Sequence, residues 1–280
     1  MTRDERLRRR FAGTRALVTG GSAGIGNAVA RRFLEVGGAG VTLVARRPER
    51  LEAAAAELRA AHPAAAVRTL ALDVADEAAV ADAVPRELGE QPVELLVNSA
   101  GDAHAGRFLD TEPDVFRRLA EVNHLGTVWM TRAAVPHLRG RPRAHVANVA
   151  SVAAVEGVYA YAAYAPTKAA VVSFSQVMRA ELRTMGIGVS VLLPPNVDTE
   201  MLAAEVEQLP PEMRPIHATS KVLPAPVVAD ALLAGIAAGR CEIMPGLDNR
   251  LIDRAHRVWR RPLRVVFDRM VGRALRRAGA

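Results

Sequence analysis

The sequence contains a single cysteine, Cys241, among 280 residues. One thiol excludes a disulfide framework within the chain and argues against a zinc site built on thiolates, so we expect no metal. The first six residues are charged rather than apolar, which predicts no secretory signal. No apolar run reaches the ~20 residues that a membrane-spanning helix needs. We therefore expect a protein of a reducing, cytoplasmic compartment.

Aromatic side chains are also scarce, at 4% of the residues. So few rings cannot support base stacking, and no nucleic-acid-binding motif is recognisable, so we expect no nucleic-acid partner. The positive charge is concentrated at the two ends. Residues 1–15 carry +4 and residues 250–277 carry +8, which leaves −5 for the body within the total of +7. Such basic ends can meet an anionic membrane or simply be solvated.

Apolar runs that alternate with helical patterns fill most of the chain. Strands are expected near 16–19, 41–45, 67–72, 93–97, 145–149 and 189–193. Helices are expected near 25–36, 49–61, 77–88, 113–138 and 164–185. Strands that are apolar on both faces and separated by helices indicate a parallel sheet with helices on both sides. We predict an α/β fold with a doubly wound, Rossmann-like sheet in one domain, residues 1–248.

Two further segments break this pattern. Residues 199–226, here called the cover segment, hold five prolines and weak periodicity, and we expect them to cover a substrate site. Residues 249–280 place apolar side chains on one helical face and arginines opposite, so we predict a basic amphipathic helical tail. Such a tail can lie on an anionic membrane surface, or pack on the body or on a sister subunit.

The first strand runs directly into a glycine-rich turn, Thr19-Gly-Gly-Ser-Ala-Gly-Ile-Gly26, and then into a helix. Glycines here let the backbone approach a pyrophosphate at the positive end of the helix. The residues expected to hold the nucleotide are Thr19, Gly20, Ser22, Gly24, Ile25 and Gly26. Arg46 follows the second strand, with no acid before Glu49, so we expect Arg46 to accept a 2′-phosphate and the cofactor to be NADP(H).

Tyr164 and Lys168 stand four residues apart, on one helix face. A nearby cation stabilises a phenolate and lowers its pKa, which would suit Tyr164 for proton transfer. Of the 37 basic residues only Lys168 and Lys221 are lysines. A lysine at position 168, in a chain that otherwise uses arginine, suggests that the reaction requires an ammonium group there. All three tyrosines cluster here, and only Tyr164 has a lysine at the fourth place.

These motifs together resemble the short-chain dehydrogenase/reductase family over about residues 16–240. The resemblance implies that Ser151 orients the substrate oxygen, and that Asn123 holds a water beside Lys168. It also implies cofactor contacts from Tyr164, Lys168 and from Asp73, Val74, Asn98, Ala100, Gly101, Pro194, Val197 and Thr199. Pro195 departs from the family pattern, which has glycine there, and so restricts the nicotinamide loop.

The resemblance implies an NADPH-dependent reductase that interconverts a ketone and a secondary alcohol. Within the family, the run from Pro194 to Glu200, the Asn-x-Leu-Gly at 123–126 and the basic tail most resemble 3-ketodihydrosphingosine reductases. We therefore expect a long-chain lipid ketone as substrate and a peripheral-membrane location. The alternatives are a soluble 3-oxoacyl or steroid-type reductase and a non-catalytic NADP-binding sensor. The helix 164–185 is apolar on more than one face, which predicts a homodimer or homotetramer.

Overall fold

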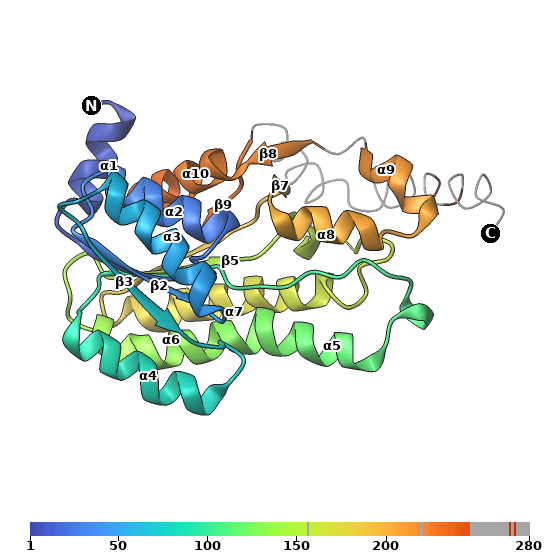
Figure 1. The fold of residues 1–280 in the computed structure, drawn as a ribbon, viewed down its shortest axis with the longest axis horizontal. Helices are drawn as coiled ribbons and strands as arrows, with labels where there is room; N and C mark the ends of the chain where they lie inside the picture. The colour runs from blue at the N-terminus through green and yellow to red at the C-terminus, as the bar shows by residue number, and fades with distance from the viewer. Residues whose placement is uncertain (156, 219–220, 247–268, 270–271, 273–280) are drawn as a thin grey trace.

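The computed structural model describes residues 1–155, 157–218 and 221–246, together with residues 269 and 272. A seven-stranded parallel sheet forms its centre, in the order β3-β2-β1-β4-β5-β6-β9 (Figure 1). Its strands are β1 (Arg15–Thr19), β2 (Gly40–Ala45), β3 (Ala66–Ala71), β4 (Leu95–Asn98), β5 (His145–Val149), β6 (Gly188–Leu192) and β9 (Glu242–Ile243). The predicted doubly wound α/β fold is confirmed.

Helices cover both faces of the sheet, as Figure 1 shows. The helices are α1 (Arg3–Phe11), α2 (Gly24–Glu35), α3 (Pro48–Ala61), α4 (Glu77–Glu90), α5 (Pro113–Leu119), α6 (Gly126–Leu138), α7 (Ala165–Arg183), α8 (Glu200–Gln208), α9 (Arg214–Ala218) and α10 (Ala225–Ala237). The short helical turns are η1 (Phe108–Asp110), η2 (Ala120–Leu125), η3 (Val152–Ala154) and η4 (Pro211–Met213). One apolar core joins α1, α2, α3 and α10 to the sheet, and a second joins α4, α6 and α7 to its other face.

The six expected strands all form, and all of them except the edge strand β3 are buried along almost their whole length. Strand β4, for example, is buried at all four positions. The expected helix 113–138 is present but is not a regular α-helix throughout, since η2 is a π-helical turn between α5 and α6. Sequence periodicity did not predict α1, α10 or β9, which complete one edge and one face of the sheet.

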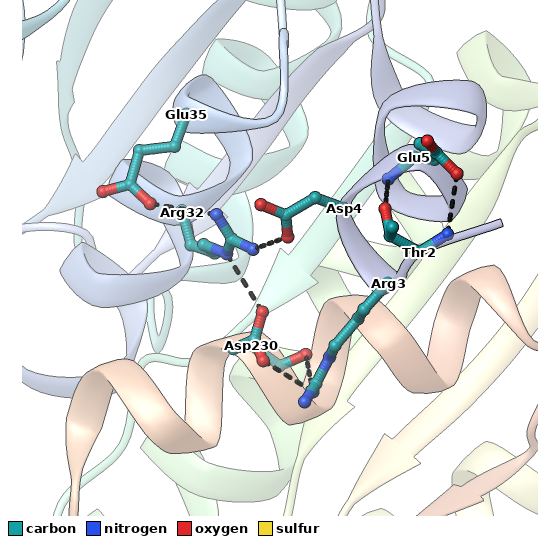
Figure 2. A network of polar contacts seen from close by, with 7 residues as sticks. All are labelled: Thr2, Arg3, Asp4, Glu5, Arg32, Glu35 and Asp230. Atoms are coloured by element: carbon teal, nitrogen blue, oxygen red, sulfur yellow. Dashed lines mark hydrogen bonds and ion pairs between the residues drawn. The ribbon is translucent and has the colours of Figure 1, made fainter.

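Helix α1 shows that the basic N-terminal end is part of the body. Leu7 and Phe11 are fully buried, and the Phe11 ring packs edge-on against Phe33 at 5.6 Å between centroids. Polar contacts then tie the helix to α2 and α10: Arg32 bonds both Asp4 and Asp230, and Asp230 also pairs with Arg3 (Figure 2). Exposed pairs of this kind contribute little stability, so the buried apolar residues hold α1 and the ion pairs orient it.

The cover segment is more regular than its weak periodicity suggested. It contains α8, η4 and α9, and a two-stranded parallel sheet of β7 (Asn196–Asp198) and β8 (Val222–Pro224) ties its beginning to its end. Within the described part of the chain, no helix is long and apolar enough to cross a membrane. The predicted amphipathic tail, residues 249–280, lies outside the described residues apart from 269 and 272, and it stays a prediction together with the domain boundary at 248.

Candidate active site

The glycine-rich turn lies where the strand order of the sheet reverses, between β1 and β4. Ligands of open parallel sheets bind at this position, beyond the carboxyl ends of the strands. Gly20 has φ +65°, and a Cβ on it would lie 2.8 Å from the Ser99 carbonyl oxygen. A Cβ on Gly26 would lie only 2.4 Å from the Gly20 carbonyl oxygen. The turn therefore requires glycine at both positions, for reasons of backbone shape and close packing.

Thr19 fastens this turn to the neighbouring strand. Its buried hydroxyl oxygen accepts hydrogen bonds from the backbone N–H groups of Ser99 and Ala100, each at 2.9 Å. The predicted cofactor residue Thr19 thus acts through the backbone of the loop after β4. Gly20, Ser22, Gly24, Ile25 and Gly26 all line a single large cavity, as predicted for a nucleotide site. A backbone that leaves this space open above a helix N-terminus fits a pyrophosphate group.

Three exposed arginines follow β2: Arg46, Arg47 and Arg50. Arg47 and Arg50 line the cavity, and Arg46 does not. Arg50 also forms a two-point ion pair with Glu200 of α8, at 2.8 and 2.9 Å. The structure therefore adds Arg50 to the adjacent pair Arg46 and Arg47 that follows the second strand in the sequence. The sequence signal was available, since four arginines lie between residues 46 and 59.

Four other predicted cofactor residues lie behind the cavity wall rather than on it. These are Asp73, Val74, Asn98 and Ala100, none of which lines the cavity. The Asp73 carboxylate accepts a hydrogen bond from the Ala75 N–H, and Val74 is buried against Gly126. Asn98 donates to Asn148 at 2.8 Å and to Thr131 at 3.0 Å, which ties β4 to β5 and α6. In this arrangement these residues shape the site from behind, and Gly101, Pro194, Val197 and Thr199 line it.

Tyr164 and Lys168 begin α7 beside the carboxyl end of β5. The Lys168 ammonium donates a hydrogen bond to the Val149 carbonyl oxygen at 3.1 Å, and Nζ lies 5.8 Å from the centre of the Tyr164 ring. Both side chains line the cavity, together with Ser151. Burial lowers the pKa of Lys168 to about 8, because its charged form has lost most of its water. The predicted pairing of the two residues in space is present.

The pKa of Tyr164 differs from the expectation. Burial raises it well above the ordinary value of 10, a hydrogen bond with the Ser151 side chain lowers it, and the charge of Glu205 raises it further. We expected Lys168 to lower this pKa, but loss of hydration outweighs any such effect here, while the ammonium bonds Val149. A phenol is protonated at neutral pH even at its ordinary pKa, so the raised pKa leaves Tyr164 protonated and makes it a weaker acid.

Asn123 lies in the π-helical turn η2 and is almost fully buried. Its carbonyl oxygen Oδ1 accepts from the Asp102 N–H at 2.8 Å, and Nδ2 donates to the Thr167 hydroxyl at 3.0 Å. It therefore links the loop after β4 to the start of α7, one residue before Lys168. This is a positioning role that the structure shows directly. π-Helical turns inside α-helices are frequent at functional sites.

Two buried carboxylates in the cover segment escaped the sequence analysis. Glu205 of α8 accepts a hydrogen bond from the Tyr161 hydroxyl. Glu212 of η4 receives two bonds from Arg107, at 2.8 and 3.0 Å, and one from the Tyr159 hydroxyl at 3.0 Å. These contacts lower the pKa of Glu212 to about 2, and the hydrogen bonds from Arg107 have the largest effect. The clustered tyrosines were the available signal, because a buried phenol needs a hydrogen-bond partner.

The cavity that these elements enclose has a volume of about 860 Å³. Its cofactor side is formed by the glycine-rich turn, and its far side by η3, the cover segment and the strand β9 region. The apolar side chains on that far side are Val155, Val158, Met201, Leu202, Met213 and Met244. Within the described residues, no group of three or more His, Cys, Asp or Glu side chains could hold a metal ion. Tyr164 thus lies in one cavity with the glycine-rich turn and with a group of apolar side chains.

The family model for short chain dehydrogenases matches residues 14–210. The chain belongs to the short-chain dehydrogenase family. A curated member from Danio rerio, a 3-dehydrosphinganine reductase, is 33% identical over 244 residues, which cover 86% of this chain and 73% of that protein. The resemblance stated from the sequence is confirmed, and the protein is an oxidoreductase of this family acting on a carbonyl or alcohol group.

Solved structures of other short-chain dehydrogenases agree with the fold. A Sphingobium yanoikuyae member in complex with NADPH has 29% identity and a TM-score of 0.76, covering 90% of this chain and 95% of that one. A Burkholderia phymatum member in complex with NAD has 26% identity and a TM-score of 0.79, covering 89% and 94%. Since both cofactors occur among these relatives, the choice between them depends on the residues after β2, where this chain has arginines and no nearby acid.

Proposed function

We propose that this short-chain dehydrogenase is an NADPH-dependent reductase that converts a long-chain lipid ketone, such as 3-ketodihydrosphingosine, to its secondary alcohol. The observation that carries the reaction is the position of Tyr164, which lines the cavity together with Ser151 and Lys168. The observations that support a lipid are the apolar far wall of the cavity and the likeness to the fish 3-dehydrosphinganine reductase.

The residues present fit NADP(H). The glycine-rich turn leaves room for its pyrophosphate, Arg47 and Arg50 line the cavity, and Arg46 precedes them directly after β2, so these arginines offer cations to its 2′-phosphate. When bound, the nicotinamide supplies the hydride that the carbonyl carbon accepts. Ser151 then bonds the carbonyl oxygen and orients it. Tyr164 donates its proton to that oxygen as the C–H bond forms, and the Lys168 charge favours the phenolate that remains.

A substrate screen tests this proposal. NADPH oxidation is measured with 3-ketodihydrosphingosine, an acetoacetyl thioester and a steroid ketone, each with NADH in a parallel series. We expect a kcat/KM at least ~100-fold higher for the long-chain ketone with NADPH, because the apolar wall binds an alkyl chain that a short ketone lacks. Activity confined to short soluble ketones would exclude the lipid, and an NADH preference would exclude the cofactor assignment.

Membrane contact and assembly belong to the same proposal. The basic tail is expected to bring the enzyme to an anionic bilayer, where a lipid ketone would reside. Flotation of the full chain with anionic and neutral vesicles tests this, and equal behaviour with both would contradict it. Val177 on α7 is 49% exposed, which supports pairing of two subunits through this helix. Light scattering that gives a monomer at micromolar concentration would contradict that part.

A further inference from the structure

Glu205 is a carboxylate in an unusual place. It projects from α8 of the cover segment, it lines the cavity, and it is only 9% exposed. Its Oε1 accepts a hydrogen bond from Tyr161, and no other hydrogen bond or ion pair reaches it from the described part of the chain. A buried carboxylate normally has a cationic partner or several donors, because loss of its water is costly.

None of the cations Arg47, Arg50, Arg107 and Lys168 bonds Glu205 within the described residues. Arg50 pairs with Glu200, Arg107 pairs with Glu212, and the Lys168 ammonium bonds the Val149 carbonyl oxygen. Within the described residues no hydrogen bond reaches the second carboxylate oxygen of Glu205, Oε2, and burial raises the pKa of this carboxyl group, which a bound cation would oppose. Tyr161 holds the first oxygen and fixes the direction of the group. The site is thus a preformed acceptor that lacks a donor, and a ligand inside the cavity can supply one.

The acceptor is close to the reacting group. The rings of Tyr161 and Tyr164 lie 6.0 Å apart between centroids, and the charge of Glu205 is near enough to raise the pKa of the Tyr164 phenol. Since Glu205 and Tyr164 line the same cavity and Tyr161 contacts both, we expect a ketone whose oxygen meets Tyr164 to place its neighbouring carbons toward the carboxylate. A protonated amine on one of those carbons would offset the burial of Glu205, which an uncharged substituent cannot do.

We propose that Glu205, held by Tyr161, is the specificity-determining residue that binds the ammonium group of an amino ketone substrate. This inference rests on the proposed function, and it assigns to named residues the choice between an amino ketone and a plain ketone of the same chain length. Tyr161 is a positioning residue, because it acts through Glu205. Neither residue takes part in proton transfer to the ketone oxygen.

The test pairs two substrates with two enzymes. A long-chain 2-amino-3-ketone and the same 3-ketone without the amine are reduced by the wild-type enzyme and by Glu205→Gln, which keeps the shape and removes the charge. We expect the wild type to prefer the amino ketone by at least ~30-fold in kcat/KM, and the variant to lose that preference. The loss should lie in KM for the amino ketone, with kcat within about threefold, since the proton donor is unchanged.

A binding measurement keeps the outcome independent of turnover. Calorimetry with NADP-loaded enzyme compares a long-chain 1,2-amino alcohol with the matching alcohol that lacks the amine. Tighter binding of the amino compound by ~30-fold in the wild type, and by less than about threefold in Glu205→Gln, supports the inference. Equal binding of both compounds by the wild type overturns it, even if plain long-chain ketones are reduced and the proposed function stands.

Two further variants test whether the effect is specific to the charge and the position of Glu205. Glu207→Gln removes an exposed charge two residues along the same helix and should keep the full preference for the amine. Tyr161→Phe removes the hydrogen bond that positions Glu205 and should lower the preference about tenfold without removing the charge. Loss of the preference in Glu207→Gln, or its retention in Glu205→Gln, would show that the ammonium is bound elsewhere.

Discussion

The glycine-rich turn and the cover segment face each other across one cavity, and they are built on different physical grounds. The turn owes its shape to backbone: Gly20 and Gly26 permit contacts that no side chain would allow. The cover segment is held by two buried carboxylates. Glu205 bonds a tyrosine hydroxyl, and Glu212 bonds a tyrosine hydroxyl and Arg107.

This difference predicts which amino-acid substitutions each region tolerates. The glycine-rich turn should be distorted by any substitution that adds side-chain volume. The cover segment should be loosened by any substitution that removes a buried carboxylate or its partner. The two regions also serve different ligands. Damage to the turn should appear in cofactor affinity, and damage to the cover segment in the KM of the ketone. Tyr164 stands between them and should affect neither affinity.

Replacement of Tyr164 by Phe is expected to have the largest effect. Without the hydroxyl no proton donor reaches the ketone oxygen, so kcat should fall ~10³-fold, while the Kd of NADPH stays within about threefold. Steady-state kinetics and fluorescence titration of NADPH measure the two quantities. Tyr159→Phe is the matched control, because it removes a neighbouring phenol hydroxyl while Glu212, which that hydroxyl bonds, keeps both Arg107 contacts. If Tyr164→Phe retained a few per cent of the activity, the proton donor would be another group.

Gly26→Ala tests the backbone-built side. Its Cβ would lie 2.4 Å from a backbone oxygen, so the turn must shift, at a cost of about 1–3 kcal/mol. If that cost is taken from cofactor binding, the Kd of NADPH rises ~10- to 100-fold, whereas the KM of the ketone at saturating NADPH changes little. Gly89→Ala on α4 meets nothing within 4 Å and should leave binding unchanged. Equal effects of the two substitutions would refute the packing argument.

Arg107→Ala tests the charge-anchored side. It leaves Glu212 buried without its ion pair, so η4 and α8 should sit less firmly over the site. We expect the KM of the ketone to rise ~30-fold with the Kd of NADPH unchanged. Arg117→Ala, on an exposed arginine that pairs only within its own helix, is the matched control. A rise in NADPH Kd as large as that in KM would mean that the two regions are not separable.

The dependence of activity on pH gives the smallest expected effect. Since burial lowers the pKa of Lys168 to about 8, the ammonium is charged at pH 7 and loses its proton as the pH rises through 8. The charge that favours the phenolate is then lost, so kcat/KM for reduction should halve near pH 8 and fall about tenfold by pH 9.

Two variants sharpen this measurement. In Lys168→Arg the guanidinium does not titrate, so the alkaline decline near pH 8 should disappear, at whatever activity remains. In Arg107→Ala the midpoint should not move, because the lysine is held by Val149 of the sheet and not by the cover segment. A shifted midpoint of the pH profile in Arg107→Ala would show that the cover segment influences Lys168, so that the two regions do not act independently.

Much of this protein could be predicted from its sequence, because the interactions that form these parts act between residues close together in the chain. Strands buried on both faces, a glycine-rich turn between strand and helix, and a lysine four residues after a tyrosine are patterns within a few residues of chain. They predicted six strands of the sheet, the cradle around Gly20 and Gly26, and the pair Tyr164 and Lys168. The contact of Arg46 with a 2′-phosphate stays a prediction, and the structure adds Arg47 and Arg50 as arginines that line the cavity.

The tertiary structure alone decided the partners of the buried charges. Glu205 meets Tyr161 across 44 residues, and Arg107 meets Glu212 across 105. Nothing near these residues in the chain distinguishes them from exposed glutamates such as Glu207. Loss of hydration and the choice of partner depend on which distant segments the fold brings together. The sequence by itself therefore determined the glycine-rich turn and the pairing of Tyr164 with Lys168, because both depend on residues close together in the chain. The tertiary structure decided which groups contact the buried carboxylates of the cover segment.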